Sequence, residues 1–310
     1  MRSARLFLLS LSVAPTLAAQ YASCDDPLFS ASTRQACQTA VDAARAFQPL
    51  AGMVISGGNA LLGASGSLGG LGHFAIGTRV NAIGASLPDP NNTSGTITSA
   101  YNGLIPAPLV EGGIGVWDRV DIVGSALLMP TGLVSGLSVK SSAHVGGIAL
   151  GLGFGARVVV LRPRTPYPAV SVSVMRRWMP KLGYAGDTTQ ANNYQFSATL
   201  RADNYRIEAG WHLGMFDVGA GLGFDHYQSD IHASGTVGGF GFGNFDTGTF
   251  AVSGTRAVVF LNGSARLGGL QLGGELGYQG GKNQTFNTNF ADFDPTAGHL
   301  FAGLGLRFGR

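Results

Sequence analysis

The sequence predicts an all-β fold, an antiparallel transmembrane barrel of about ten strands, with eight or twelve as alternatives, preceded by a short N-terminal periplasmic helix. Three observations predict it. Charged residues make up only 12% of the 310 residues and glycine contributes 49 positions, about half and twice their usual shares. From His73 onward, apolar residues recur at every second position. The connections between the predicted strands alternate between short and long.

The composition also excludes some classes of protein. The chain has 20 Lys and Arg residues against 17 Asp and Glu, so its charge gives no reason to expect a nucleic-acid partner. The only long apolar run lies at the N-terminus. A helical membrane span is therefore not expected in the mature chain.

The first residues have the features of a secretory signal peptide. Arg2 and Arg5 form a positive region, an apolar stretch follows from Leu6 to Val13, and small residues precede a cleavage site near Ala19. A retained membrane anchor is the alternative, but the apolar run is short and is followed by Pro15. We therefore expect residues 1–19 to be removed.

Two cysteines, Cys24 and Cys37, follow the signal peptide. An even number of cysteines in an exported chain favours a disulfide bond between them. The alternative is a lipid anchor on Cys24. Tyr21 disfavours it, because a lipoprotein signal usually carries leucine at that position.

The N-terminal region, residues 20–70, differs in composition from the rest of the chain. Helix-forming residues from Ser32 to Phe47 predict one helix of about four turns that Pro49 ends. A glycine-rich stretch follows and is interpreted as a flexible link to the first strand. We expect this region to be a plug inside the barrel or a cap beneath it on the periplasmic side.

The strands of the barrel, residues 71–310, show one recurring pattern, illustrated by the last of them. Its apolar face carries Leu300, Leu304 and Phe308, whereas the other face is mostly glycine and ends with Arg307. A glycine-rich face is poorly suited to a solvated surface and costs backbone entropy. The pattern is typical of a transmembrane barrel, with the apolar face against lipid and the glycine face toward the lumen.

The connections support the same count of strands. Long connections are predicted over residues 87–107, 130–143, 180–204, 228–249 and 280–296, with short turns between them. Regular alternation requires an even number of strands, with both ends of the barrel on the periplasmic side. Residues 194–202 alternate as well, and parity favours an extension above the membrane over an extra strand. Aromatic residues predicted to form interfacial girdles are Trp117, Trp178, Tyr184, Trp211, Tyr227, Tyr278 and Phe308.

Over His73 to Phe308, and in its signal peptide, the chain resembles bacterial outer-membrane β-barrel proteins. The resemblance rests on this pattern and on no family-specific motif. It implies location in the outer membrane, contact with outer-membrane lipid and lipopolysaccharide, and insertion by the outer-membrane assembly machinery. That machinery usually reads a terminal aromatic residue, whereas here Phe308 is followed by Gly309 and Arg310.

The predicted lumen carries a set of charged side chains, and Asn81, His212, Asn262 and Gln271 add neutral polar groups. The charged set is Arg79, Glu111, Arg157, Arg206, Glu208, Arg256, Arg266, Glu275 and Arg307. One interpretation is an ion-paired polar core that fills a narrow barrel. The other is a narrow pore with an arginine-biased lining that favours anions.

An enzyme is not expected. Candidate groups at the outer rim are Asp225, His226, Asp230, His232 and His299. Asp225 and His226 are neighbours on a strand and point to opposite faces. The sequence contains no G-x-S-x-G motif. Neither a metal site nor a cofactor is expected.

The sequence thus predicts a structural outer-membrane barrel or a narrow, porin-like passive channel for small solutes or ions. A non-conducting barrel that binds a ligand or partner through its long external loops is the main alternative. An outer-rim enzyme is a second, less favoured one.

Overall fold

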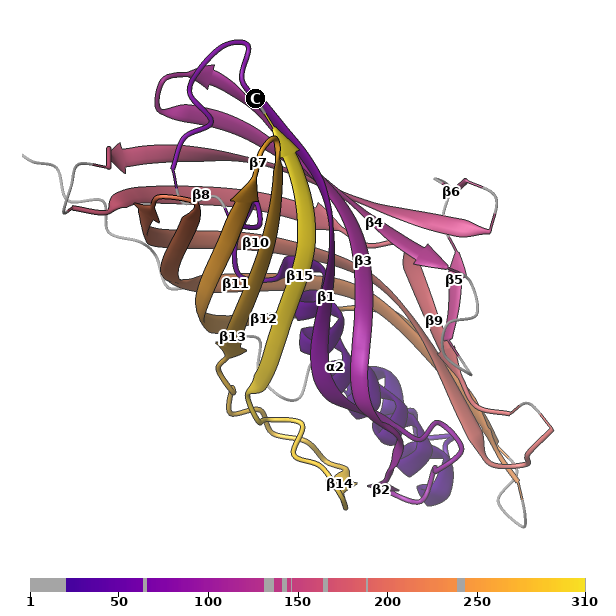
Figure 1. Cartoon of the computed structure of the whole chain (residues 1–310). Coiled ribbons are helices and arrows are strands. Elements are labelled where there is room, and N and C mark those ends of the chain that lie inside the picture. Colours follow the sequence, from indigo (N-terminus) through magenta and orange to yellow (C-terminus); the bar gives the residue numbers. More distant parts are fainter. Residues whose placement is uncertain are drawn as a thin grey trace, which may run out of the picture.

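The computed structural model describes residues 21–63, 66–130, 137–140, 144–145, 147–163, 167–187, 189–238 and 243–309. The predicted signal peptide lies outside these residues. Figure 1 shows a closed barrel with a long helix inside it. Within the described ranges, no helix is both long enough and apolar enough to cross a membrane.

Ten antiparallel strands form the wall, as the sequence predicts. In order around the barrel they are β1 (Phe74–Pro88), β3 (Ser99–Trp117), β4 (Val120–Pro130), β7 (Ile148–Leu161), β8 (Ala169–Trp178), β10 (Asn193–Leu213), β11 (Phe216–Val237), β12 (Gly243–Leu267), β13 (Leu270–Gln279) and β15 (His299–Gly309). The last strand pairs with the first from Ala75↔Gly309 to Ile83↔Phe301, which closes the barrel. Closure leaves no unpaired edge at the level of the membrane.

The remaining strands are short and lie outside this ring. They are β2 (Thr96–Ile97), β5 (Leu137–Lys140), β6 (His144–Val145), β9 (Lys181–Ala185) and β14 (Asn289–Phe290). Strand β9 continues the line of β8 and pairs with β10 between Gln195 and Ala198. Residues 194–202 are therefore the extension of a barrel strand, as parity predicted.

The two ends of the barrel differ. Tight connections join β3 to β4, β10 to β11 and β12 to β13, with glycines at positive φ at Gly214 and Gly268. We call this end periplasmic and the opposite end external. The external connection between β11 and β12 is shorter than predicted, because these strands remain paired as far as Val237↔Gly243. Most of the predicted loop over residues 228–249 is thus strand.

The two faces of strand β11 exchange their polar and apolar character partway along the strand. Its outward side chains are apolar as far as Phe224 and polar from His226 onward, while its inward side chains change from Asp225 to Tyr227 and Ile231. Exposed apolar side chains continue this belt around the barrel, among them Ile76, Val80, Ile122, Phe154, Val174, Ile207, Leu261, Leu272, Leu276 and Leu304. The inversion marks where the strands pass from lipid into water. The parts of β10, β11 and β12 beyond it form what we call the external wall.

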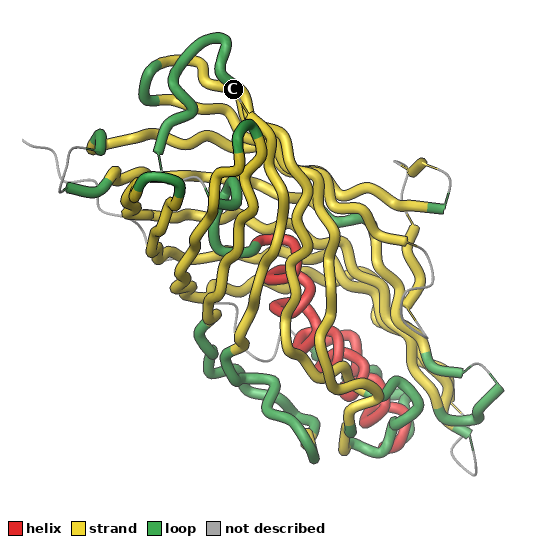
Figure 2. The backbone as a smooth tube through the Cα atoms, viewed as in Figure 1, coloured by secondary structure: helices red, strands yellow, loops and turns green. Residues whose placement is uncertain are grey.

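Helix α2 (Ala31–Ser56) follows the short 3₁₀ turn η1 (Ala22–Cys24) and packs against the inner faces of β10, β11, β12 and β1 (Figure 2). The Ser30 hydroxyl caps it by accepting the Thr33 amide at 3.1 Å. The helix is longer than the predicted four turns and lies inside the barrel instead of on its periplasmic side. Pro49 does not end it, because burial of most of its residues offsets the cost of about 3 kcal/mol for an interior proline.

Aromatic residues pack the helix against the external wall. The ring of Phe47 lies 6.1 Å from that of Tyr184 and 5.5 Å from that of Phe196, and Tyr227 contacts Gly52. Tyr184 and Tyr227 are 3% and 1% exposed, so their assignment to the girdles was wrong. Both lie beyond the polarity inversion, where the inward face is the apolar one. The other predicted girdle residues, Trp117, Trp178, Trp211, Tyr278 and Phe308, are exposed.

Candidate functional site

The N-terminal region is fastened at the external end of the barrel. Cys24 and Cys37 form the predicted disulfide bond. The Tyr21 hydroxyl donates to Asp42 Oδ1 at 2.5 Å, and burial raises the pKa of this hydroxyl. Asp42 Oδ2 accepts the amides of Asn287 and Thr288 at 2.8 and 2.9 Å. The helix is therefore tied to the external connection between β13 and β15.

Below the helix, residues 57–63 and 66–70 continue through the lumen without regular secondary structure, and we call these residues the lumen segment. Arg79 on β1 binds the first residues of this segment. Its Nη1 donates to the Asn59 carbonyl at 2.9 Å, and its guanidinium nitrogens lie 3.5 Å from Glu111 Oε2 and 3.4 Å from Glu275 Oε1. All three side chains are buried, so the arginine is neutralised by wall carboxylates while it binds the segment.

The carboxylates bind the amides of the same segment. Glu275 accepts Gly58 N–H and Asn59 N–H, each at 3.0 Å, and Glu111 accepts Leu62 N–H at 2.8 Å. Hydrogen bonds to a charged acceptor are about twice as strong as neutral ones. The wall thereby satisfies backbone groups that the irregular segment cannot satisfy itself.

Strand β10 binds the same segment from the side of the lumen opposite β1. Arg206 donates to the carbonyls of Gly58 and Gly57 at 2.9 and 3.0 Å and pairs with Asp225 at 2.7 Å. Glu208 accepts the side-chain amide of Asn59 at 2.9 Å. We call Arg79, Glu111, Arg206, Glu208 and Glu275 the lumen clamp.

Further polar contacts hold the segment nearer the periplasm. Asp121 pairs with Arg157 at 2.8 Å and accepts the Leu68 amide at 3.1 Å. Gln271 donates to the Gly63 carbonyl at 3.1 Å. The lumen segment therefore follows the lumen to its periplasmic end.

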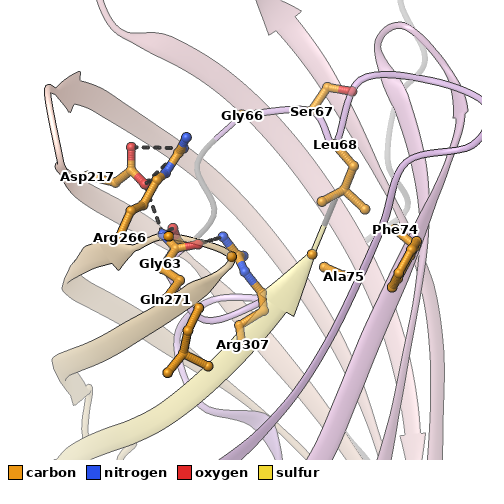
Figure 3. Close-up of a pocket in the computed structure, with 14 residues that line it drawn as sticks. Gly63, Gly66, Ser67, Leu68, Phe74, Ala75, Asp217, Arg266, Gln271 and Arg307 are labelled. Carbon is orange, nitrogen blue, oxygen red and sulfur yellow. Dashed lines mark hydrogen bonds and ion pairs between the residues drawn. The ribbon is translucent and has the colours of Figure 1, made fainter.

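A cavity of about 330 Å³ opens at this end (Figure 3). Asp217, Arg266, Gln271 and Arg307 line one side of it and Leu68 the other. Asp217 pairs with Arg266 at 3.1 Å and accepts from Gln271 at 2.9 Å, and Arg307 donates to Gln271. The cavity is a polar vestibule in which wall charges are largely paired with each other.

The predicted lumen residues occupy four places. The lumen clamp gathers five of them around the lumen segment, and Arg157 lies buried closer to the periplasm. Arg266 and Arg307 lie at the vestibule, with the side chain of Arg266 half-exposed. Arg256 stands apart, near the external boundary, where its Nη1 contacts the Gly280 carbonyl at 3.3 Å.

The predicted set of lumen charges left out three aspartates that complete these pairs, Asp121, Asp217 and Asp225, of which Asp225 was considered only as a rim group. Asp217 and Asp225 share the glycine face of β11, so the period of two contained the signal for their inward orientation. Asn59 is different. Nothing in the pattern of its glycine-rich surroundings distinguishes it.

The candidate catalytic groups at the rim do not converge. Asp225 is buried against Arg206, whereas His226 contacts Thr255 at 3.0 Å on the outer side. His232 pairs with Asp246 at 2.8 Å. Among the described residues, no three His, Cys, Asp or Glu side chains are grouped so that they could hold a metal ion.

Comparisons with known proteins show only remote likeness. No protein-family model matches the chain, and no curated protein matches it. The translocator domain of autotransporter NalP from Neisseria meningitidis aligns with 90% of this chain and 99% of that one, at 12% identity and a TM-score of 0.43. The outer membrane protease OmpT from Escherichia coli aligns with 77% of this chain and 97% of that one, at 8% identity and a TM-score of 0.37.

A third solved structure, Ail of Yersinia pestis in complex with sucrose octasulfate, aligns over 77% of this chain and 99% of that one, at 8% identity and a TM-score of 0.30. Likeness at this level carries no argument about function.

The class of the protein follows from its own architecture, a closed ten-stranded antiparallel barrel with an apolar belt and tight turns at one end. The described residues thus have the fold of an outer-membrane-type β-barrel.

Proposed function

We propose that the protein is a non-enzymatic outer-membrane barrel that is closed by its own N-terminal region and binds a ligand or partner at its external end. The observation that carries the proposal is the lumen clamp. Its charged side chains bind the backbone of the lumen segment at Gly58, Asn59 and Leu62. A lumen occupied in this way does not pass solutes.

The charges support a closed barrel over an anion-selective pore. An arginine-biased lining attracts anions only where its charge is not already neutralised. Arg79, Arg157 and Arg206 are each paired with wall carboxylates. At the level of the lumen clamp, the lumen segment contacts side chains from strands on opposite sides of the barrel, which leaves less of the lumen open.

The external end supports the binding part of the proposal because hydrogen bonds join some of its described segments to one another. The Tyr184 hydroxyl donates to the Pro88 carbonyl at 2.8 Å, and Asp292 accepts the Ser99 amide at 2.9 Å. A surface fixed before binding loses less conformational entropy when it binds. Around the belt we propose contact with outer-membrane lipid and lipopolysaccharide, after insertion by the assembly machinery.

A gated channel is the second candidate function. The helix is held by an apolar core and a disulfide bond, whereas residues 57–59 are held mainly by polar contacts to the wall. Water or ions can replace polar contacts, so the lumen segment could withdraw while the helix stays in place. The barrel would then conduct only after this rearrangement.

Single-channel recording in a planar bilayer tests the closed barrel. The refolded full-length mature chain is expected to be silent, whereas Glu111→Gln/Glu275→Gln is expected to show openings, because the segment loses its charged acceptors. Asp203→Asn is the matched control. It removes a carboxylate that pairs with Arg176 on the outer face and is expected to stay silent.

Two outcomes would refute the plug. One is steady conductance of the unmodified chain. The other is silence of the double variant after limited proteolysis has shown that its lumen segment is released. Voltage- or solute-dependent openings of the unmodified chain would instead favour the gated channel.

A further inference from the structure

The described residues of the N-terminal region extend from the external end of the barrel to its periplasmic end. At the external end, Asp42 binds the connection between β13 and β15. At the level of the belt, Asn59 binds Glu208, and near the periplasmic turns the Leu68 amide binds Asp121. The chain then enters β1 at Phe74, on the periplasmic side.

The two ends of the described chain therefore lie on opposite sides of the membrane. At the periplasmic end, Gly309 pairs with Ala75. The start of the helix and its disulfide bond lie at the other end, on the side of β2 and β14 (Figure 1). A secreted chain reaches the outer membrane from the periplasm, so this arrangement requires the N-terminal region to end on the far side.

We propose that the barrel carries its own N-terminal region across the outer membrane and displays the residues around Tyr21 at the cell surface. This inference uses the path of the chain and does not depend on whether the lumen conducts.

The residues next to Tyr21 are placed for display. Asp25 and Asp26 are exposed, and Leu28 is 90% exposed. The disulfide bond from Cys24 fixes this short stretch to the helix. The surface on the external side is thus a defined structure, joined to the barrel through its core.

The lumen has no room for a helix beside the lumen segment at the level of the clamp. At the level of the clamp, a single backbone is in hydrogen-bond contact with side chains from β1, β3, β10 and β13. An α-helix with its side chains is about 10–12 Å wide. A helix therefore does not fit beside these contacts once the lumen segment is in place.

Labelling of lysines in intact cells tests the topology. Leu28→Lys places an amine at the external end, and Leu71→Lys places one at the periplasmic end, where Leu71 is 82% exposed. A membrane-impermeant amine reagent is applied before and after permeabilisation, and the modified positions are read by mass spectrometry. Both substitutions replace highly exposed side chains and are expected to leave the fold intact, which resistance to unfolding on SDS gels checks.

Position 28 is expected to react in intact cells to at least ten times the extent of position 71, and position 71 only after permeabilisation. Equal protection of both positions in intact cells would overturn the proposal, as would labelling of position 71 alone. An epitope inserted before Tyr21 provides a second measurement. Antibody binding to intact cells supports display, and binding only after permeabilisation contradicts it.

Discussion

Glu275→Gln tests the lumen clamp most sharply among single substitutions. Glu275 accepts two segment amides at 3.0 Å and lies 3.4 Å from Arg79. The glutamine side chain retains one acceptor oxygen. Its NH₂ group takes the place of the other oxygen and cannot accept the backbone N–H group of Gly58 or Asn59. Breaking a buried ion pair by removing one partner costs about 3–5 kcal/mol. We expect the low end of this range, because Arg79 keeps Glu111 at 3.5 Å.

Local hydrogen exchange measures this effect directly. A loss of about 3 kcal/mol raises the population of the released segment about 100-fold. The amides of Gly58 and Asn59 are therefore expected to exchange about 100 times faster in Glu275→Gln than in the unmodified protein, while barrel strand amides stay protected. The control Asp203→Asn is expected to leave both amides unchanged. Equal protection at these two positions in Glu275→Gln and the unmodified chain would refute the clamp.

Three further predictions concern the ends of the helix and the external loops. Gly57→Ala is expected to lower the temperature at which the barrel unfolds in SDS, because Gly57 has φ +59° and ψ −170°, and strain there costs about 1–3 kcal/mol. Replacing Cys24 and Cys37 by serine removes about 3 kcal/mol of chain-entropy stabilisation, so the stretch before the helix is expected to be cut by protease while the barrel remains folded. Hydrogen bonds from Ser99 hold the pKa of Asp292 below its ordinary 3.8, so this contact persists at and above pH 3.8 and is lost as the pH falls through the lowered value. Exchange of the Ser99 amide is then expected to accelerate, and a rate independent of pH beyond the intrinsic dependence would contradict this.

The period of two predicted the barrel well because it reports a local property of the strands. The outward row ending at Phe224 and the inward Arg206 both follow from it, and so does the number of strands, once the connections are counted. Lipid on one side and a polar lumen on the other impose this pattern independently on each strand.

The same pattern could not predict the external wall. Beyond Phe224 the two faces exchange character, so Tyr227 resembles an interfacial aromatic residue in sequence while it packs on Gly52. Only the presence of the helix in the lumen makes that inward face apolar. Gly52 and Tyr227 are 175 residues apart in the sequence, so local periodicity contains no information about their contact.

The helix shows the second limit. Pro49 predicts an end to the helix from local chemistry, yet the surrounding barrel stabilises seven more residues up to Ser56. The lumen clamp could be predicted only in part. Its wall charges were visible in the sequence, but their common partner, the backbone near Asn59, has no side-chain signature.

The most direct test of the lumen segment's position is photo-crosslinking from Leu61, a fully buried residue that packs with Val123 and Met175 on the wall. Photo-leucine has nearly the shape of leucine and leaves this contact in place. In the protein refolded into lipid, irradiation is expected to join the peptide containing Leu61 to peptides of β4 and β8. Photo-leucine at Leu127 is the control for the crosslinking reaction. If it joins its own neighbours while Leu61 gives no crosslink to the wall, the segment lies elsewhere and the barrel is not closed in this way.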